Sequence, residues 1–161
     1  MFFERLRRGL RHSLILVSAL PNASKRALLA RMLAFSRALP AQFNQPLPQM
    51  MAKLTPPVPS DRQNLTPDDI RRLADALAAW HFRSPLGICL RRSLLRYHFL
   101  RQAGLPVSIV FGARLKGEYE GGGLGGHAWL ILNGLPYYEN EQDYTGFVEM
   151  YVYPVDSRRG S

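Results

Sequence analysis

Two stretches of sequence decide the fold: CLRRSLLRYHFLRQAGLPVSIVFGA at residues 89–113 and GHAWLILNG at residues 126–134. The first stretch begins with leucines and aromatic residues at helical spacing, and a glycine stop follows at Gly104. Beyond the glycine the sequence becomes β-branched and apolar, which is typical of a buried strand. This order predicts a helix over residues 89–103 and a strand over residues 107–113.

The second stretch predicts a strand that ends in a tight turn. Asn133 and Gly134 form the dipeptide that is the strongest short-range signal for a two-residue hairpin. A glycine-rich loop over residues 114–126 precedes this strand. Strands are expected at residues 127–132, 135–139 and 147–153.

Helices are expected before this core. Apolar residues at helical spacing, with arginines between them, predict a helix over residues 2–20. Asn22 or Ser24 caps a second helix, which we expect to run to Leu39 and to end at Pro40. Both helices are amphipathic and basic, so their apolar faces are expected to pack on the rest of the domain or on a partner.

Prolines dominate the next segment, residues 40–60, which predicts a connector without helix or central strand. A further helix then begins at Thr66, since Pro67 fits its first position and Asp69 completes a capping motif with the threonine. The expected organisation is therefore a basic helical N-terminal region with its connector, residues 1–60, and a second domain, residues 61–155. Helices followed by a small antiparallel sheet predict an α+β fold.

Composition narrows the function classes. The chain has 161 residues, of which 47% are apolar and 20% charged, as in ordinary globular proteins. A single cysteine excludes a disulfide framework within the chain. The longest apolar run is too short to span a bilayer, and no convincing signal-peptide cleavage site follows that run. A reducing, cytoplasmic localisation is expected.

Charge is distributed unevenly along the chain. Residues 1–37 carry eight basic residues and one acidic residue, whereas residues 105–161 carry four basic and seven acidic residues. The basic part could meet nucleic acid, an anionic membrane surface or an acidic partner, or it could be a solvated arginine-rich helix face. No nucleic-acid-binding motif is present, so no nucleic acid is expected.

Two residues are candidates for nucleophilic chemistry. Cys89 lies where a loop becomes a helix, and unsatisfied N–H groups and the helix dipole favour a thiolate there. His127 is expected to start a strand, and a cysteine and a histidine in these places could form a thiolate–imidazolium pair. The alternatives are a small buried apolar role for Cys89 and a structural role for His127.

A base also needs a group that orients its second ring nitrogen. A two-residue turn would place Asn140 opposite His127, and a three-residue loop would place Glu139 there instead. Asp143 lies three residues beyond Asn140 and would need the chain to curl back. The sequence leaves these three candidates open.

The motifs CLRRSLL, beginning at Cys89, and GHAW, containing His127, together resemble the B2 leader peptidases of lasso-peptide biosynthesis, which are small transglutaminase-like cysteine peptidases. The resemblance covers residues 66–143. It implies a papain/transglutaminase-like core with N-terminal helices packed on a small antiparallel sheet. It further implies a Cys-His-Asp triad of Cys89, His127 and Asp143, with Glu139 and Asn140 as competitors for the third place.

The resemblance also implies a function and partners. The chain would be an endopeptidase that removes the leader from a ribosomally made precursor peptide, with no metal or organic cofactor. Its partners would be the precursor's leader region, a separate leader-recognition protein and an ATP-dependent macrolactam cyclase, with peripheral membrane contact through residues 1–37 as a further possibility. The alternatives are a transglutaminase-like acyltransferase and a non-catalytic basic module that binds membrane or nucleic acid.

Overall fold

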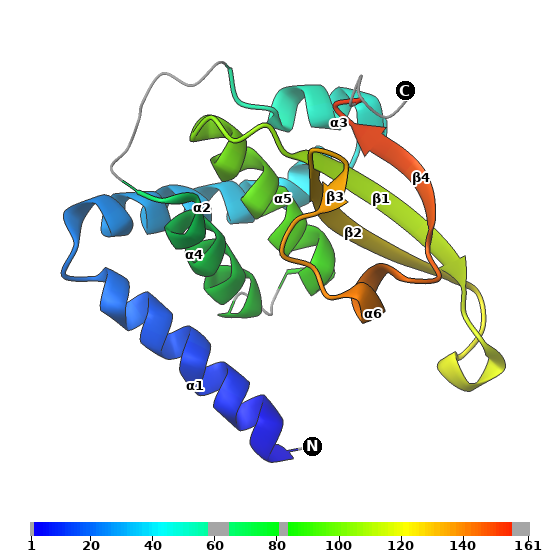
Figure 1. Ribbon diagram of the computed structural model, residues 1–161, viewed down its shortest axis with the longest axis horizontal. Helices are drawn as coiled ribbons and strands as arrows, with labels where there is room; N and C mark the ends of the chain where they lie inside the picture. The colour runs from blue at the N-terminus through cyan, green and yellow to red at the C-terminus, as the bar shows by residue number, and fades with distance from the viewer. Residues whose placement is uncertain (1, 58–64, 81–83, 156–161) are drawn as a thin grey trace. The chain divides into compact units, whose positions relative to one another are not determined.

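The computed structural model describes residues 2–57, 65–80 and 84–155 (Figure 1). The chain divides into two compact units, Met1–Leu105, which is helical, and Pro106–Ser161, which contains the sheet. Helices followed by a four-stranded antiparallel sheet confirm the predicted α+β class.

The first two helices are present where the sequence predicted them, although the second runs beyond its predicted end. Helix α1 spans Phe2–Ala19 and packs along α4, and α2 spans Ala23–Gln42 and packs on α4 and α5 (Figure 1). Asn22 caps α2, because its side chain accepts a hydrogen bond from the Lys25 N–H at 3.0 Å. The buried side chains of α2 include Leu28, Met32 and Leu39. No helix in the described ranges is long and apolar enough to cross a bilayer.

Two expectations for the proline-rich segment were wrong. Helix α2 does not end at Pro40 but continues through it to Gln42, and the segment predicted as a connector contains α3, Leu47–Leu54. Proline is tolerated in the first turn of a helix, and Pro48 occupies that turn in α3. One side of α3 is buried, and its buried residues are Met50, Met51 and Leu54. The expected domain boundary after residue 60 lies outside the described residues.

Helix α4, Pro67–Trp80, begins with the predicted capping motif. Asp69 N–H donates to Thr66 Oγ1 at 3.1 Å, and Thr66 N–H donates back to Asp69 Oδ2 at 3.3 Å. A forked ion pair then joins α4 to α5, since Arg96 Nε and Nη2 contact the two carboxylate oxygens of Asp75 at 2.6 and 2.7 Å. Arg96 is 3% exposed, so this arginine belongs to the packed interior rather than to a solvated helix face.

Helix α5, Ile88–Gln102, ends at the predicted glycine. Gly104 has φ 89° and its N–H donates to Arg101 O, while Leu105 N–H donates to Leu100 O at 2.9 Å. This pair of bonds is the Schellman motif, which requires a left-handed residue at the glycine position. The buried apolar residues of α5 lie in its middle and last turns, and they include Leu94, Leu95, Tyr97, Phe99 and Leu100.

The sheet of the second unit has the strand order β3-β2-β1-β4 (Figure 1). Its strands are β1, Ser108–Leu115; β2, Leu124–Leu132; β3, Leu135–Pro136; and β4, Val148–Tyr153. β1 pairs antiparallel with both β2 and β4.

The glycine-rich loop is shorter than predicted. Pairing of β1 with β2 continues to Leu115 and Leu124, and a 3₁₀ turn, η1 at Glu118–Glu120, closes the hairpin. His127 is therefore the fourth residue of β2 and not the first residue of a strand.

The next turn has the two residues predicted. Leu132 pairs with Leu135, and Asn133 and Gly134 have φ values of 53° and 81°, as a type I′ turn requires. The third strand is shorter than expected, because β3 ends at Pro136 and Tyr138 adopts φ 51°.

Candidate functional site

Cys89 occupies the first turn of α5, as predicted. Gly87 is the N-cap, so Cys89 is the second helical residue, and the first bond of the helix runs from Arg91 N–H to Gly87 O at 3.1 Å. The N–H of Cys89 lies ahead of that bond, among the donors that a helix N-terminus leaves without intrahelical acceptors. The thiol is half-buried. A nucleophile placed here has the positive end of the helix beside it.

Arg91 fixes the loop that leads into Cys89. Its Nε donates to Leu86 O at 3.1 Å, and Leu86 N–H donates to Ser84 Oγ at 3.2 Å. Arg91 is 3% exposed, and burial lowers the pKa of its guanidinium from the ordinary value. Arginine remains charged in proteins, so a cation lies one turn or less from the thiol-bearing residue.

His127 lies on one face of β2 among aromatic rings. Its ring centroid is 5.8 Å from that of Trp129, with the planes within 20° of parallel, and 5.3 Å from that of Phe147. Trp129 is 3% exposed and stacks in turn on Tyr144 at 6.0 Å. Trp129 follows His127 by two residues and so shares its face of β2, whereas Tyr144 and Phe147 come from a distant part of the sequence.

Gly112 makes room for this aromatic cluster. It pairs with His127 across the β1–β2 ladder. A Cβ at residue 112 would lie 2.6 and 2.8 Å from two ring atoms of Trp129 and 3.1 Å from Phe147 Cβ. Only a residue without a side chain fits there, so Gly112 is a requirement of the site that sequence reasoning missed.

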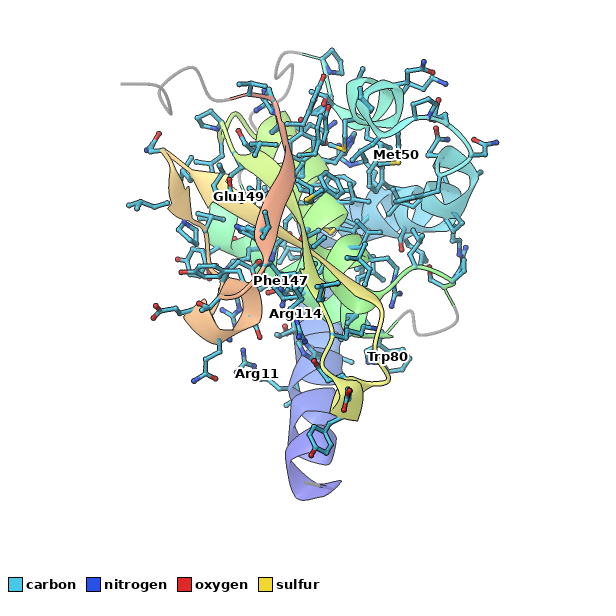
Figure 2. The ribbon with its side chains drawn as sticks, turned by 90° about the vertical axis from the view of Figure 1, so that its right-hand side faces the viewer. Arg11, Met50, Trp80, Arg114, Phe147 and Glu149 are labelled. Atoms are coloured by element: carbon cyan, nitrogen blue, oxygen red, sulfur yellow. The ribbon has the colours of Figure 1, made fainter. Side chains whose placement is uncertain are left out.

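Arg114 closes the other side of the cluster. Its guanidinium lies 5.2 Å from the centre of the Phe147 ring, and the two side chains are labelled in Figure 2. It also forms a forked pair with the Glu120 carboxylate at 2.8 and 2.5 Å. Arg114 and the Gly117 N–H hold the pKa of Glu120 at about 2. The carboxylate of the hairpin turn is therefore engaged by Arg114.

The candidates for the residue that orients His127 lie just beyond β3. Asp143 belongs to α6, Glu141–Tyr144, where it accepts a hydrogen bond from Asn140 Nδ2 at 3.3 Å and is exposed. The next residue, Tyr144, stacks on Trp129. The chain thus curls back, through Tyr144, toward the aromatic cluster that contains His127, and the role of Asp143 stays a prediction.

The strand register that favoured Asn140 does not extend far enough. The two-residue turn is present, but pairing of β2 with β3 stops at Pro136. Asn140 is the N-cap of α6 and not a strand residue opposite His127. Glu139 lies between the end of β3 and α6 and is half-buried.

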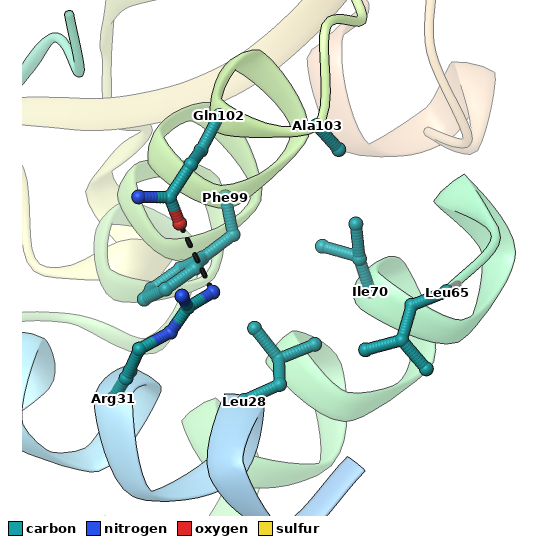
Figure 3. A pocket seen from close by; sticks show the side chains of 7 residues that line it. All are labelled: Leu28, Arg31, Leu65, Ile70, Phe99, Gln102 and Ala103. Atoms are coloured by element: carbon teal, nitrogen blue, oxygen red, sulfur yellow. Dashed lines mark hydrogen bonds between the residues drawn. The ribbon is translucent and has the colours of Figure 1, made fainter. Parts of the chain in front are cut away.

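A small pocket lies apart from the predicted site residues. Figure 3 shows it between α2, α4 and α5, with space for little more than a water molecule. Its lining residues are Leu28, Arg31, Leu65, Ile70, Phe99, Gln102 and Ala103. It is too small to hold a peptide side chain, and none of Cys89, His127 and Asp143 lines it.

A chain with its one cysteine in the first turn of a helix, and with a histidine among rings on an antiparallel sheet, has the parts of a cysteine-dependent hydrolase or acyltransferase. Residues 16–152 match the Transglutaminase-like superfamily, and the chain belongs to that superfamily. Its members are typically cysteine proteases or acyltransferases. Comparison with curated proteins and with solved structures gives no match. The matched region contains Cys89, His127 and Asp143.

Proposed function

We propose that this chain is a cysteine endopeptidase that removes the leader from a ribosomally made precursor peptide in lasso-peptide maturation. The observation that carries the proposal is the position of Cys89 in the first turn of α5, in a chain of the transglutaminase-like superfamily. The resemblance of the CLRRSLL and GHAW motifs to the B2 leader peptidases supplies the substrate class. Cys89 is the nucleophile, His127 the base and acid, and Asp143 the residue that orients His127.

The reaction proceeds through an acyl-enzyme. His127 takes the thiol proton, and the Cys89 sulfur attacks the carbonyl carbon of the scissile peptide bond. Backbone N–H groups at the start of α5, including that of Cys89, stabilise the resulting oxyanion. The C–N bond breaks as His127 delivers its proton to the leaving amine. Water, deprotonated by His127, then attacks the thioester, which releases the leader as a carboxylic acid and restores the thiol.

Two partners belong to the proposal. A separate leader-recognition protein delivers the precursor, and an ATP-dependent cyclase closes the macrolactam ring on the freed amine. Acyl transfer is the second candidate, because the superfamily contains acyltransferases. In that reaction an amine would replace water as the group that attacks the thioester.

The test uses the full chain with the precursor peptide and the recognition protein encoded beside its gene. Mass spectrometry should find a free leader acid with wild type and uncleaved precursor with Cys89→Ala. An added primary amine that becomes covalently attached to the leader in place of water would identify an acyltransferase. Cleavage by Cys89→Ala at the wild-type rate, or the absence of precursor and cyclase genes from the neighbourhood, would contradict the proposal.

A further inference from the structure

We propose that the outward face of α1 docks the protein on the surface of an anionic lipid bilayer. Three aliphatic side chains form the α1 stripe: Leu10, Leu14 and Val17, which are 57%, 67% and 61% exposed. Their spacing of four and three residues places them on one side of the helix. Leu20, directly after the helix, is 51% exposed.

The stripe is additional to the apolar surface that α1 uses in folding. The inward side of α1 packs along α4, where Ala19 is 1% exposed. Packing of α1 therefore does not account for aliphatic side chains on its outer side. In the sequence, Leu6 and Phe3 continue the same spacing toward the N-terminus.

A tryptophan lies next to the stripe. Trp80, the last residue of α4, is 53% exposed, and its indole N–H donates to Ser13 Oγ of α1 at 3.2 Å. Trp80 and Arg11 are both labelled in Figure 2. Tryptophan, with an apolar ring and one polar group, is enriched where proteins meet the boundary between headgroups and hydrocarbon.

The charge of the region around the stripe is strongly positive. Residues 1–60 contain nine basic residues and a single acidic one, Glu4. Arg11 and Arg26 are exposed, whereas the acidic Asp69 of α4 is already paired with Lys25 at 2.7 Å. A strongly basic helix with an aliphatic stripe suits the plane of an anionic bilayer, where the stripe contacts hydrocarbon and the arginines contact lipid phosphates. An acidic protein partner would also be complementary to this charge. It would not explain the exposed tryptophan beside the stripe, which is typical of the bilayer interface.

The experiment is co-sedimentation of the full chain with vesicles. We expect binding to phosphatidylcholine vesicles that contain about a quarter phosphatidylglycerol, weaker binding to pure phosphatidylcholine, and release at high salt. The variant Leu10→Gln/Leu14→Gln/Val17→Gln should bind the anionic vesicles about tenfold or more weakly. The control Leu115→Gln/Leu124→Gln replaces side chains that are 82% and 71% exposed on the β1–β2 hairpin, and it should bind like wild type.

Each other outcome overturns the proposal. If wild type does not bind anionic vesicles but binds soluble polyglutamate, the α1 stripe would instead face an acidic protein partner. A stripe variant that loses only self-association in sedimentation velocity, with vesicle binding unchanged, would assign the face to a second copy. Equal loss in the stripe variant and the hairpin control would mean that the α1 stripe is not the binding surface. Precursor cleavage plays no part in these measurements, so they are independent of the proposed peptidase activity.

Discussion

At the scale of single residues, the site depends as much on a missing side chain as on the reactive ones. Gly112 lies opposite His127 in the ladder, and the Trp129 ring occupies the space that a side chain at residue 112 would fill. The tryptophan in turn stacks on the imidazole. The orientation of His127 therefore depends on a glycine in the neighbouring strand.

We predict that Gly112→Ala destabilises the protein by about 1–3 kcal/mol, because the new methyl group displaces the Trp129 ring. Urea denaturation measures the free energy of unfolding, and near-UV circular dichroism reports on the tryptophan. Gly126→Ala is the matched control, since a Cβ at residue 126 would meet nothing within 4 Å. Equal stability of the two variants would show that the cluster does not need the glycine.

The choice of the residue that orients His127 can also be tested one residue at a time. We predict that Asp143→Ala lowers kcat/KM for precursor cleavage by about a hundredfold or more, and that Glu139→Ala and Asn140→Ala cost less. Glu118→Ala controls for the loss of one negative charge, because Glu118 is exposed in η1. If Glu139→Ala or Asn140→Ala proved the most damaging of the three, the assignment of Asp143 would be wrong.

The sequence indicated the candidate site residues more readily than their surroundings. Cys89 stood out as the one thiol at a predicted helix start, and the helix does begin there. Phe147 and Gly112 could not be found in this way, because their roles arise from contacts between residues far apart in the chain. Strand pairing brings those residues together, and local spacing does not encode it.

At the scale of helices and strands, predictions succeeded where a local motif fixes a boundary. The Thr66–Asp69 cap and the Asn133-Gly134 turn each satisfy their own backbone groups within a few residues. They therefore form as predicted whatever the rest of the chain does.

Predictions failed where tertiary packing outweighed local signals. Prolines suggested a connector, yet the burial of Met50 and Met51 stabilises α3 within it. The glycines before His127 suggested a loop, yet Gly125 and Gly126 pair with Arg114 and Ala113 in the extended hairpin. Glycine is unfavourable in a strand, but a ladder that continues on both sides overrides the preference.

The packing of α5 against its neighbours predicts a pH dependence of stability. His98 of α5 is half-buried, its Nδ1 lies 2.7 Å from Leu54 O at the end of α3, and its ring lies 4.4 Å from that of Phe35 in α2. Burial, with a smaller contribution from Arg31, lowers the pKa of His98 in the folded protein. The unfolded chain then binds the proton more strongly, so the stability that His98 contributes is complete above the ordinary histidine pKa and is lost as pH falls below it.

We therefore expect the free energy of unfolding of wild type to fall between about pH 7 and pH 5. His98→Asn keeps a donor for Leu54 O but does not titrate, so its stability should fall less over the same range. Urea denaturation at both pH values measures the difference. An identical decrease in wild type and variant would show that His98 does not contribute to the dependence.

At the scale of the whole molecule, charge and chemistry are divided between the ends of the chain. The first 37 residues are strongly basic, and residues 105–161 are mildly acidic. The transglutaminase-like match covers residues 16–152 and so includes parts of both regions. The helical unit carries Cys89 and the sheet unit carries His127 and Asp143, so the proposed catalysis requires that the two units act together.

The central claim is that Cys89 and His127 act as one catalytic pair. The rate at which iodoacetamide alkylates the full chain tests it most directly, because Cys89 is the only cysteine and no substrate is required. At about pH 6 an ordinary thiol is almost entirely protonated and reacts slowly, whereas a thiol that has given its proton to a histidine reacts fast. We predict that wild type reacts about tenfold or more faster than His127→Ala at this pH, and that the two rates converge near pH 9. Equal rates at pH 6 would contradict the pairing of Cys89 with His127.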